Sequence, residues 1–198
     1  MSRKLDIAVV RVHVKIGSFF FLLAALSFSH VLGLARAAPA DSAATASPAL
    51  AQAAAAGQTD AVRSLLAGGA PVDGKDASEW TALHFASAHG WTDVAALLLD
   101  RGADPNARAR FDMTPLHWAS MRGHAEVAGL LTRRGARVDA RSAYGMTPLH
   151  LAADDKVVAV LVTAGAQVNA LDDRGRTPLH TTRQNKVAKA LIDHGADL

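Results

Sequence analysis

Half of the 198 residues are hydrophobic, so the chain has enough apolar side chains for a core, and a disordered protein is excluded. It has no cysteine, which excludes disulfide bonds and thiol catalysis. The formal net charge is +3, but five basic side chains and one acidic side chain precede residue 41, which leaves 16 basic and 17 acidic side chains. This balance argues against a nucleic-acid-binding protein, which is expected to carry a basic patch.

The first 37 residues have the layout of a secretory signal peptide. A positively charged stretch ends at Lys15, an apolar run covers residues 16–34, and small residues follow. Small residues precede two candidate cleavage sites, after Ala37 and after Ala40. We therefore predict an exported protein, periplasmic or secreted, with no membrane contact after cleavage. The abundance of Ala and Arg is typical of a GC-rich bacterial genome and favours the periplasm.

The same apolar run is long enough to cross a bilayer, which needs roughly 17 to 25 residues. The alternative is therefore an uncleaved anchor in the inner membrane that holds a structural scaffold outside the cytoplasm. Residues 38–47 lack apolar periodicity and predict a flexible linker, so that the folded part begins near Pro48.

A four-residue motif then recurs through the chain. It reads Thr-Ala-Leu-His at Thr81 and Thr-Pro-Leu-His at Thr114, Thr147 and Thr177, with spacings of 33, 33 and 30 residues. A Gly-Ala pair recurs in the same register, at Gly69, Gly102, Gly135, Gly165 and Gly195. Self-similarity at this period is typical of a stacked repeat protein.

Each copy of the motif predicts the start of a helix. Thr can cap the free amides at a helix N-terminus, and Pro fits the first position because no donor is needed there. Gly in the Gly-Ala pair can adopt the left-handed conformation that ends a second helix. Counting 33 residues back from Thr81 reaches Pro48, which reveals a degenerate first repeat with helices over residues 49–56 and 60–67.

These motifs resemble the ankyrin repeat, whose signature is a turn, a Thr-Pro-Leu-His opening and two antiparallel helices. The resemblance covers roughly three quarters of the chain, and it implies an all-α solenoid of about five helix-turn-helix repeats with short β-turn fingers. The repeats are expected at about residues 48–80, 81–113, 114–146, 147–176 and 177–198.

The last two repeats are three residues shorter than the others. The missing residues match Met121, Arg122 and Gly123, between the two helices. Three residues rise about 4.5 Å in a helix, so the first helix of these repeats should end early. Asp154-Asp155 and Gln184-Asn185 are expected to form the turn, with Asp155 as the cap of the next helix.

The sequence contains no motif that indicates catalysis. The motif histidines occur once per repeat, at His84, His117, His150 and His180, so they should form a row and not a cluster. The ankyrin resemblance implies that they are scaffold residues. Zinc-ligand spacings, a nucleophile elbow, a phosphate loop and a dinucleotide fingerprint are all missing from the sequence. We therefore predict a non-enzyme without metal or cofactor.

The loops before the motifs contain Trp, Phe, Tyr, Met and Arg, which are enriched at protein interfaces. The resemblance implies that these loops project as fingers beside the first helices and line a concave face. We predict that a partner protein binds a monomer there, with the groove deepest beside Trp80 and Phe111. The alternative is that Trp80 and its equivalents only cover the edges of the stack. The predicted binding residues are Trp80, His89, Arg108, Arg110, Phe111, Met113, Met121, Arg122, Arg141, Tyr144 and Met146.

Overall fold

The computed structural model describes residues 42–197 of the chain, which lie within one compact unit of residues 39–198. The predicted signal peptide and both cleavage sites lie outside the described residues. Between residues 42 and 197 all regular secondary structure is helical, and there is no β-strand. The predicted all-α class is therefore confirmed.

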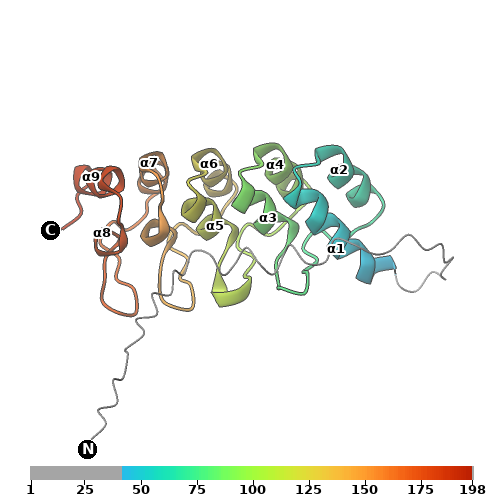
Figure 1. Cartoon of the computed structure of the whole chain (residues 1–198). Coiled ribbons are helices and arrows are strands. Elements are labelled where there is room, and N and C mark those ends of the chain that lie inside the picture. Colours follow the sequence, from blue (N-terminus) through green and yellow to red (C-terminus); the bar gives the residue numbers. More distant parts are fainter. Residues whose placement is uncertain (1–41, 198) are drawn as a thin grey trace, which may run out of the picture. The chain divides into compact units, whose positions relative to one another are not determined.

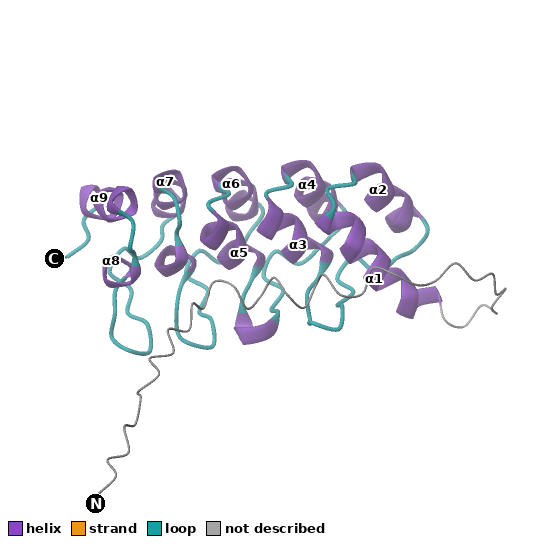
Figure 2. Cartoon of the chain, in the orientation of Figure 1, coloured by secondary structure: helices purple, strands orange, loops and turns teal. Residues whose placement is uncertain are grey.

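The helices form two parallel rows, and the long loops project beyond one of them (Figure 1). The inner row, next to the loops, consists of α1 (Ser42–Ala55), α3 (Ala82–His89), α5 (Pro115–Arg122), the 3-10 helix η2 (Pro148–Leu151) and α8 (Pro178–Thr181). The outer row consists of α2 (Thr59–Ala67), α4 (Thr92–Asp100), α6 (Ala125–Arg133), α7 (Asp155–Thr163) and α9 (Asn185–Asp193). Each helix packs against its neighbours in the same row, as in a solenoid (Figure 2).

Eight of the ten helices in the two rows bury at least one leucine in the core. The second helices bury Leu98, Leu131, Leu161 and Leu191 completely, and the first helices bury Leu50, Leu83, Leu116 and Leu149 almost completely. Burial of one such side chain contributes about 1.5–3 kcal/mol relative to exposure. Alanines between these leucines let the helices approach closely, so the apolar core continues from α1 to α9 without a break.

The Gly-Ala pairs end the second helices as predicted. Gly102 and Gly135 adopt φ angles of 87° and 88°. A Cβ atom at either position would meet nothing within 4 Å, so the requirement for glycine comes from the left-handed backbone and not from lack of space.

Two predicted boundaries differ from the structure. Helix α1 begins at Ser42, so residues 42–47 are helical and not a flexible linker. Alanine has the highest helix propensity of all residues, and the alanines of this segment explain why α1 extends N-terminal to Pro48. Asp154, and not Asp155, caps α7: its side chain accepts a hydrogen bond from the backbone N–H of Lys156 at 2.9 Å.

The shortened repeats have shortened first helices, as predicted. Helices α3 and α5 contain 8 residues each, whereas η2 and α8 contain 4 each. The second helices α4, α6, α7 and α9 all keep 9 residues. The deletion is therefore confined to the inner row.

We expect the shortened repeats to be the less stable end of the stack, because stability in repeat proteins is approximately a sum over repeats and their interfaces. Amide hydrogen exchange should be roughly tenfold faster in residues 147–193 than in residues 81–135. Insertion of Met-Arg-Gly between Ala153 and Asp154, which restores the full repeat length, should slow exchange in η2 and α7. Uniform protection along the stack, or no effect of the insertion, would contradict this prediction.

Candidate functional site

Four loops of the same design project from the inner row, and we call them fingers: residues 75–80, 108–113, 141–146 and 171–176. Each finger is closed by a backbone hydrogen bond of 2.9 Å. The bonded pairs are Asp76 with Trp80, Ala109 with Met113, Ser142 with Met146, and Asp172 with Arg176. In three fingers the first residue of the bonded pair is Asp76, Ser142 or Asp172. Its side-chain oxygen also accepts hydrogen bonds from two backbone N–H groups of the same finger, which stabilises the turn.

The second finger is the exception, because Ala109 has no side-chain acceptor. Its tip is a short 3-10 turn, η1 (Arg110–Asp112), in which Phe111 and Asp112 have φ angles of 60° and 56°. The other fingers have a left-handed residue only at the position of Asp112. A bulky side chain in this conformation is uncommon, and the strain is about 1–3 kcal/mol. The second finger therefore holds Phe111 in a strained backbone.

Phe111 and Tyr144 form an exposed aromatic pair across the tips of the second and third fingers. Their side chains are 45% and 56% exposed, and their ring centroids are 5.9 Å apart at an interplanar angle of 29°. The guanidinium carbon of Arg110 lies 5.8 Å from the centroid of the Phe111 ring. Three of the predicted binding residues thus lie together at the finger tips and are exposed.

Arg108 and Arg141 connect the fingers to one another. Lys75 donates to the carbonyl of Arg108 at 2.9 Å, Arg108 donates to the carbonyl of Arg141 at 3.2 Å, and Arg141 donates to that of Leu171 at 2.9 Å. Arg108 also pairs with Asp112 at 3.3 Å, and Arg141 pairs with Asp173 at 3.0 Å. Both arginines therefore use part of their hydrogen-bonding capacity inside the protein and are about half exposed.

Trp80 packs into the stack and is only partly exposed. Its ring centroid lies 4.3 Å from that of Trp118, 4.8 Å from that of Phe85 and 6.0 Å from that of His84. Phe85 and Trp118 are the residues directly after the motif histidines, and the next in this series is Leu151. Sequence reasoning missed this inner-helix series, although its regular spacing directly after each histidine is a signal that could have revealed it.

The other predicted binding residues are spread along the inner face. Met113, Met121 and Met146 are partly buried, whereas His89 and Arg122 are exposed at the C-terminal ends of α3 and α5. His89 contacts the backbone oxygen of Phe85 at 2.9 Å through Nδ1.

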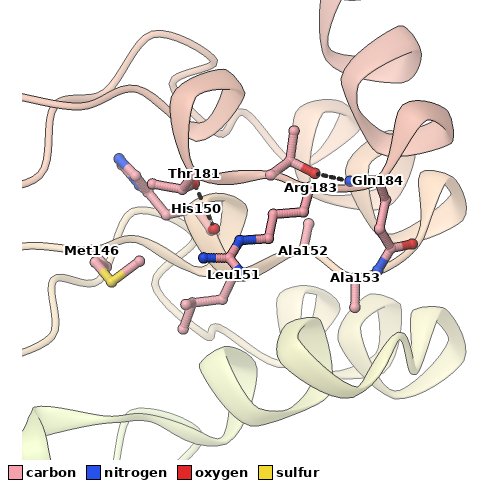
Figure 3. A pocket seen from close by; sticks show the side chains of 9 residues that line it. Met146, His150, Leu151, Ala152, Ala153, Thr181, Arg183 and Gln184 are labelled. Carbon is pink, nitrogen blue, oxygen red and sulfur yellow. Dashed lines mark hydrogen bonds between the residues drawn. The ribbon is translucent and has the colours of Figure 1, made fainter. Parts of the chain in front are cut away.

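One hollow lies between the two shortened first helices. A depression of about 250 Å³ lies between η2 and α8, and its lining includes Met146, Leu151, Ala153 and Arg183 (Figure 3). Beside Trp80, where the groove is predicted to be deepest, the Trp80 ring packs against that of Trp118. Where the first helices are short, the missing turn leaves space open.

Three of the four motif histidines connect their first helix to the finger that follows. The backbone N–H of Thr114 donates to Nδ1 of His117 at 3.1 Å, and Nε2 of His117 lies 3.0 Å from the carbonyl oxygen of Met146. A backbone N–H can only donate and a carbonyl can only accept, so this ring is neutral with its proton on Nε2. His84 and His150 make the same contacts with their own threonines and fingers, which confirms the predicted scaffold role.

Burial lowers the pKa of His84 and of His117 from 6.5 to about 4, because the charged ring would lose its hydration. The carbonyls of Met113 and Met146 raise these pKa values and offset only part of this effect. Among the described residues there is no group of three potential metal-ligating side chains.

A second connection between repeats lies at the C-terminal ends of the inner helices. Sequence reasoning missed this connection as well. Nε1 of Trp91 donates to the carbonyl of Ala55 at 3.0 Å, and Nε2 of His124 lies 3.2 Å from the carbonyl oxygen of Ala88. Trp91 and His124 occupy equivalent positions, 33 residues apart. Each therefore satisfies a carbonyl near the C-terminal end of the first helix in the preceding repeat.

These helix pairs, stacked in register with projecting loops, define a solenoid repeat protein. A family model described as "Ankyrin repeats (3 copies)" matches residues 22–109, 106–172 and 138–198. The chain therefore belongs to the ankyrin repeat family. A search of curated proteins found no significant match. Ankyrin repeats are generally protein–protein interaction modules and are typically non-catalytic.

The histidine geometry predicts a pH-dependent stability. Because the folded pKa lies below the unfolded value of 6.5, the unfolded chain binds more protons between pH 6.5 and pH 4. The free energy of unfolding should be at its full value above pH 6.5 and should fall by roughly 2–3 kcal/mol for each of His84 and His117 as the pH drops to about 4.5.

Urea unfolding across this pH range measures the effect. His117→Gln, which can still accept at one end and donate at the other, should remove the part of the slope that His117 contributes. A His117→Gln variant with the slope of the original chain would show that other groups titrate.

Proposed function

We propose that this chain is an exported, non-catalytic module that binds another protein, as a monomer, through its finger tips and the adjacent inner-helix face. The observation that carries the proposal is the stacked, exposed pair of Phe111 and Tyr144. The balanced charge of the repeats supports a protein partner over a nucleic acid.

Aromatic and arginine side chains dominate the binding energy of protein interfaces, because they bury a large area with few rotatable bonds. Phe111, Tyr144 and Arg110 bring these residue types together on two adjacent fingers. The strained backbone at Phe111 adds to this argument, since strain persists where the surrounding structure imposes it and is concentrated at functional sites. The pair therefore has the composition and the exposure of a binding anchor.

The predicted anchor can be tested by truncation. Phe111→Ala and Tyr144→Ala should each weaken partner binding at least tenfold, because loss of an interface anchor commonly costs about 2 kcal/mol or more. The thermal midpoint should stay nearly unchanged, since exposed side chains outside the packing change stability by about 0.5 kcal/mol or less. Ile192, which is 44% exposed on the outer helix α9, is the matched control, and Ile192→Ala should not change binding.

The partner for this experiment is captured from the periplasmic or secreted fraction with residues 41–198 and then titrated against each variant. If both finger variants melt several degrees lower and bind normally when folded, the aromatic pair only covers the edge of the stack.

Export is supported by the order of charged, apolar and small residues in the first 37 residues. The competing proposal is a scaffold tethered to the membrane by an uncleaved apolar segment. Among the described residues no helix is long and apolar enough to cross a membrane. The apolar run of residues 16–34 lies outside them.

N-terminal processing separates these two proposals. We expect the mature chain to begin at Ala38 or Asp41, as measured by the intact mass of the protein from the periplasmic or secreted fraction. A chain that keeps its first 37 residues and is recovered with membranes would favour the tethered scaffold and contradict the proposed export.

A further inference from the structure

The hollow between η2 and α8 follows directly from the shortened repeats. It replaces the helical turn that Met121, Arg122 and Gly123 provide in the preceding repeat. Met146, Leu151 and Ala153 line its apolar part and are each partly exposed. Arg183 reaches across it from the segment after α8 (Figure 3).

The size of the hollow indicates what it can hold. Small-molecule sites are usually enclosed pockets of about 300–1,000 Å³. This depression of about 250 Å³ is smaller and open to solvent, so it does not fit such a ligand. Met146 and Leu151 on its apolar side suit an apolar side chain that projects from the surface of a partner, and Thr181, Arg183 and Gln184 are among the residues that line the rest.

The charged groups of this half of the chain are of both signs. The finger carboxylates have basic partners: Asp112 pairs with Arg108, Asp173 with Arg141, and Asp172 with Arg176. Asp154 caps α7, and the exposed Asp155 follows it. Arg122 and Arg183 are both exposed, and neither forms a salt bridge within residues 42–197.

Arg183 is part of the lining of the hollow. The backbone N–H of Ala153, another lining residue, donates to the carbonyl of Ser120 at 3.1 Å, so the neighbouring helix α5, which ends at Arg122, contacts this part of the chain. The hollow is thus lined by one guanidinium group, and a second belongs to the end of the neighbouring helix.

We propose that this hollow recognises an acidic segment of the partner protein, which inserts an apolar side chain beside Leu151 and places carboxylates on Arg122 and Arg183. The proposal rests on the proposed function and specifies the chemistry of the partner. Guanidinium groups hold carboxylates through paired, charge-assisted hydrogen bonds. Such contacts select acidic segments and reject basic ones, while the apolar side chain fixes their position.

A peptide selection tests this preference directly and does not require an identified partner. A random peptide library displayed on phage is selected against the purified protein, and the most enriched sequence is synthesised and titrated. We expect enrichment of Asp or Glu next to Leu, Ile, Met or Phe. Selection against the double variant Arg122→Glu, Arg183→Glu should lose the acidic preference.

Titration of the selected peptide locates the site. Arg183→Gln and Ala153→Phe, which fills the hollow, should each weaken binding about tenfold. Arg63 is an exposed arginine on α2, and Arg63→Gln should leave binding unchanged. Because Arg183 is exposed, its substitution should not unfold the stack, and equal melting temperatures of the variants verify this.

The outcomes distinguish a failure of the acidic-segment proposal from a failure of the proposed protein-binding function. Peptides without acidic enrichment, or binding that Phe111→Ala weakens but Arg183→Gln and Ala153→Phe do not, would overturn the acidic-segment proposal and leave the protein-binding function standing. Failure to select any peptide, together with failure to capture a partner, would overturn both.

Discussion

The arrangement of the last three fingers depends on one neutral imidazole ring in each of three repeats, at His84, His117 and His150. Each of these rings accepts from the threonine that starts its own helix and, through Nε2, bonds to the carbonyl that closes the next finger. Two features of the fold are thereby joined through a single buried side chain: the beginning of a first helix and the end of a loop 29 residues further along. The ring must remain uncharged for both bonds to form, and its burial ensures that it does. Buried histidines therefore determine the positions of the exposed finger residues.

The periodic features of the fold could be predicted from the sequence because their causes are local. A threonine cap, a proline at the first helical position and a left-handed glycine each act within a few residues, so Thr114-Pro115 and Gly135 indicate helix ends without tertiary information. The length of η2 followed from a deletion that can be counted. The start of α1 and the cap at Asp154 were missed because neighbouring residues with similar propensities compete for the same position.

The candidate site was less predictable because exposure depends on contacts between repeats. Trp80 and Phe111 are both aromatic finger residues, yet Trp80 packs on Trp118 while Phe111 remains exposed. Trp80 is the last residue of its finger and meets the next inner helix, whereas Phe111 lies at the tip of a finger in which Ala109 provides no side-chain acceptor. Likewise, the sequence indicated that the shortened helices would lose Arg122-like residues. It did not indicate that the vacated space would become the hollow.

The bonds between fingers have a consequence for the thermodynamics of recognition. Loops usually lose conformational freedom when they bind, and this loss subtracts from the affinity. Here the forked guanidinium groups of Arg108 and Arg141 already fasten each finger to the next, so most of that ordering is completed during folding. The first finger is joined to the second by Lys75, whose flexible chain and single ammonium group restrain it less. Affinity should therefore be gained at low entropic cost over the second to fourth fingers, while the first finger retains the freedom to adjust to the shape of what it meets.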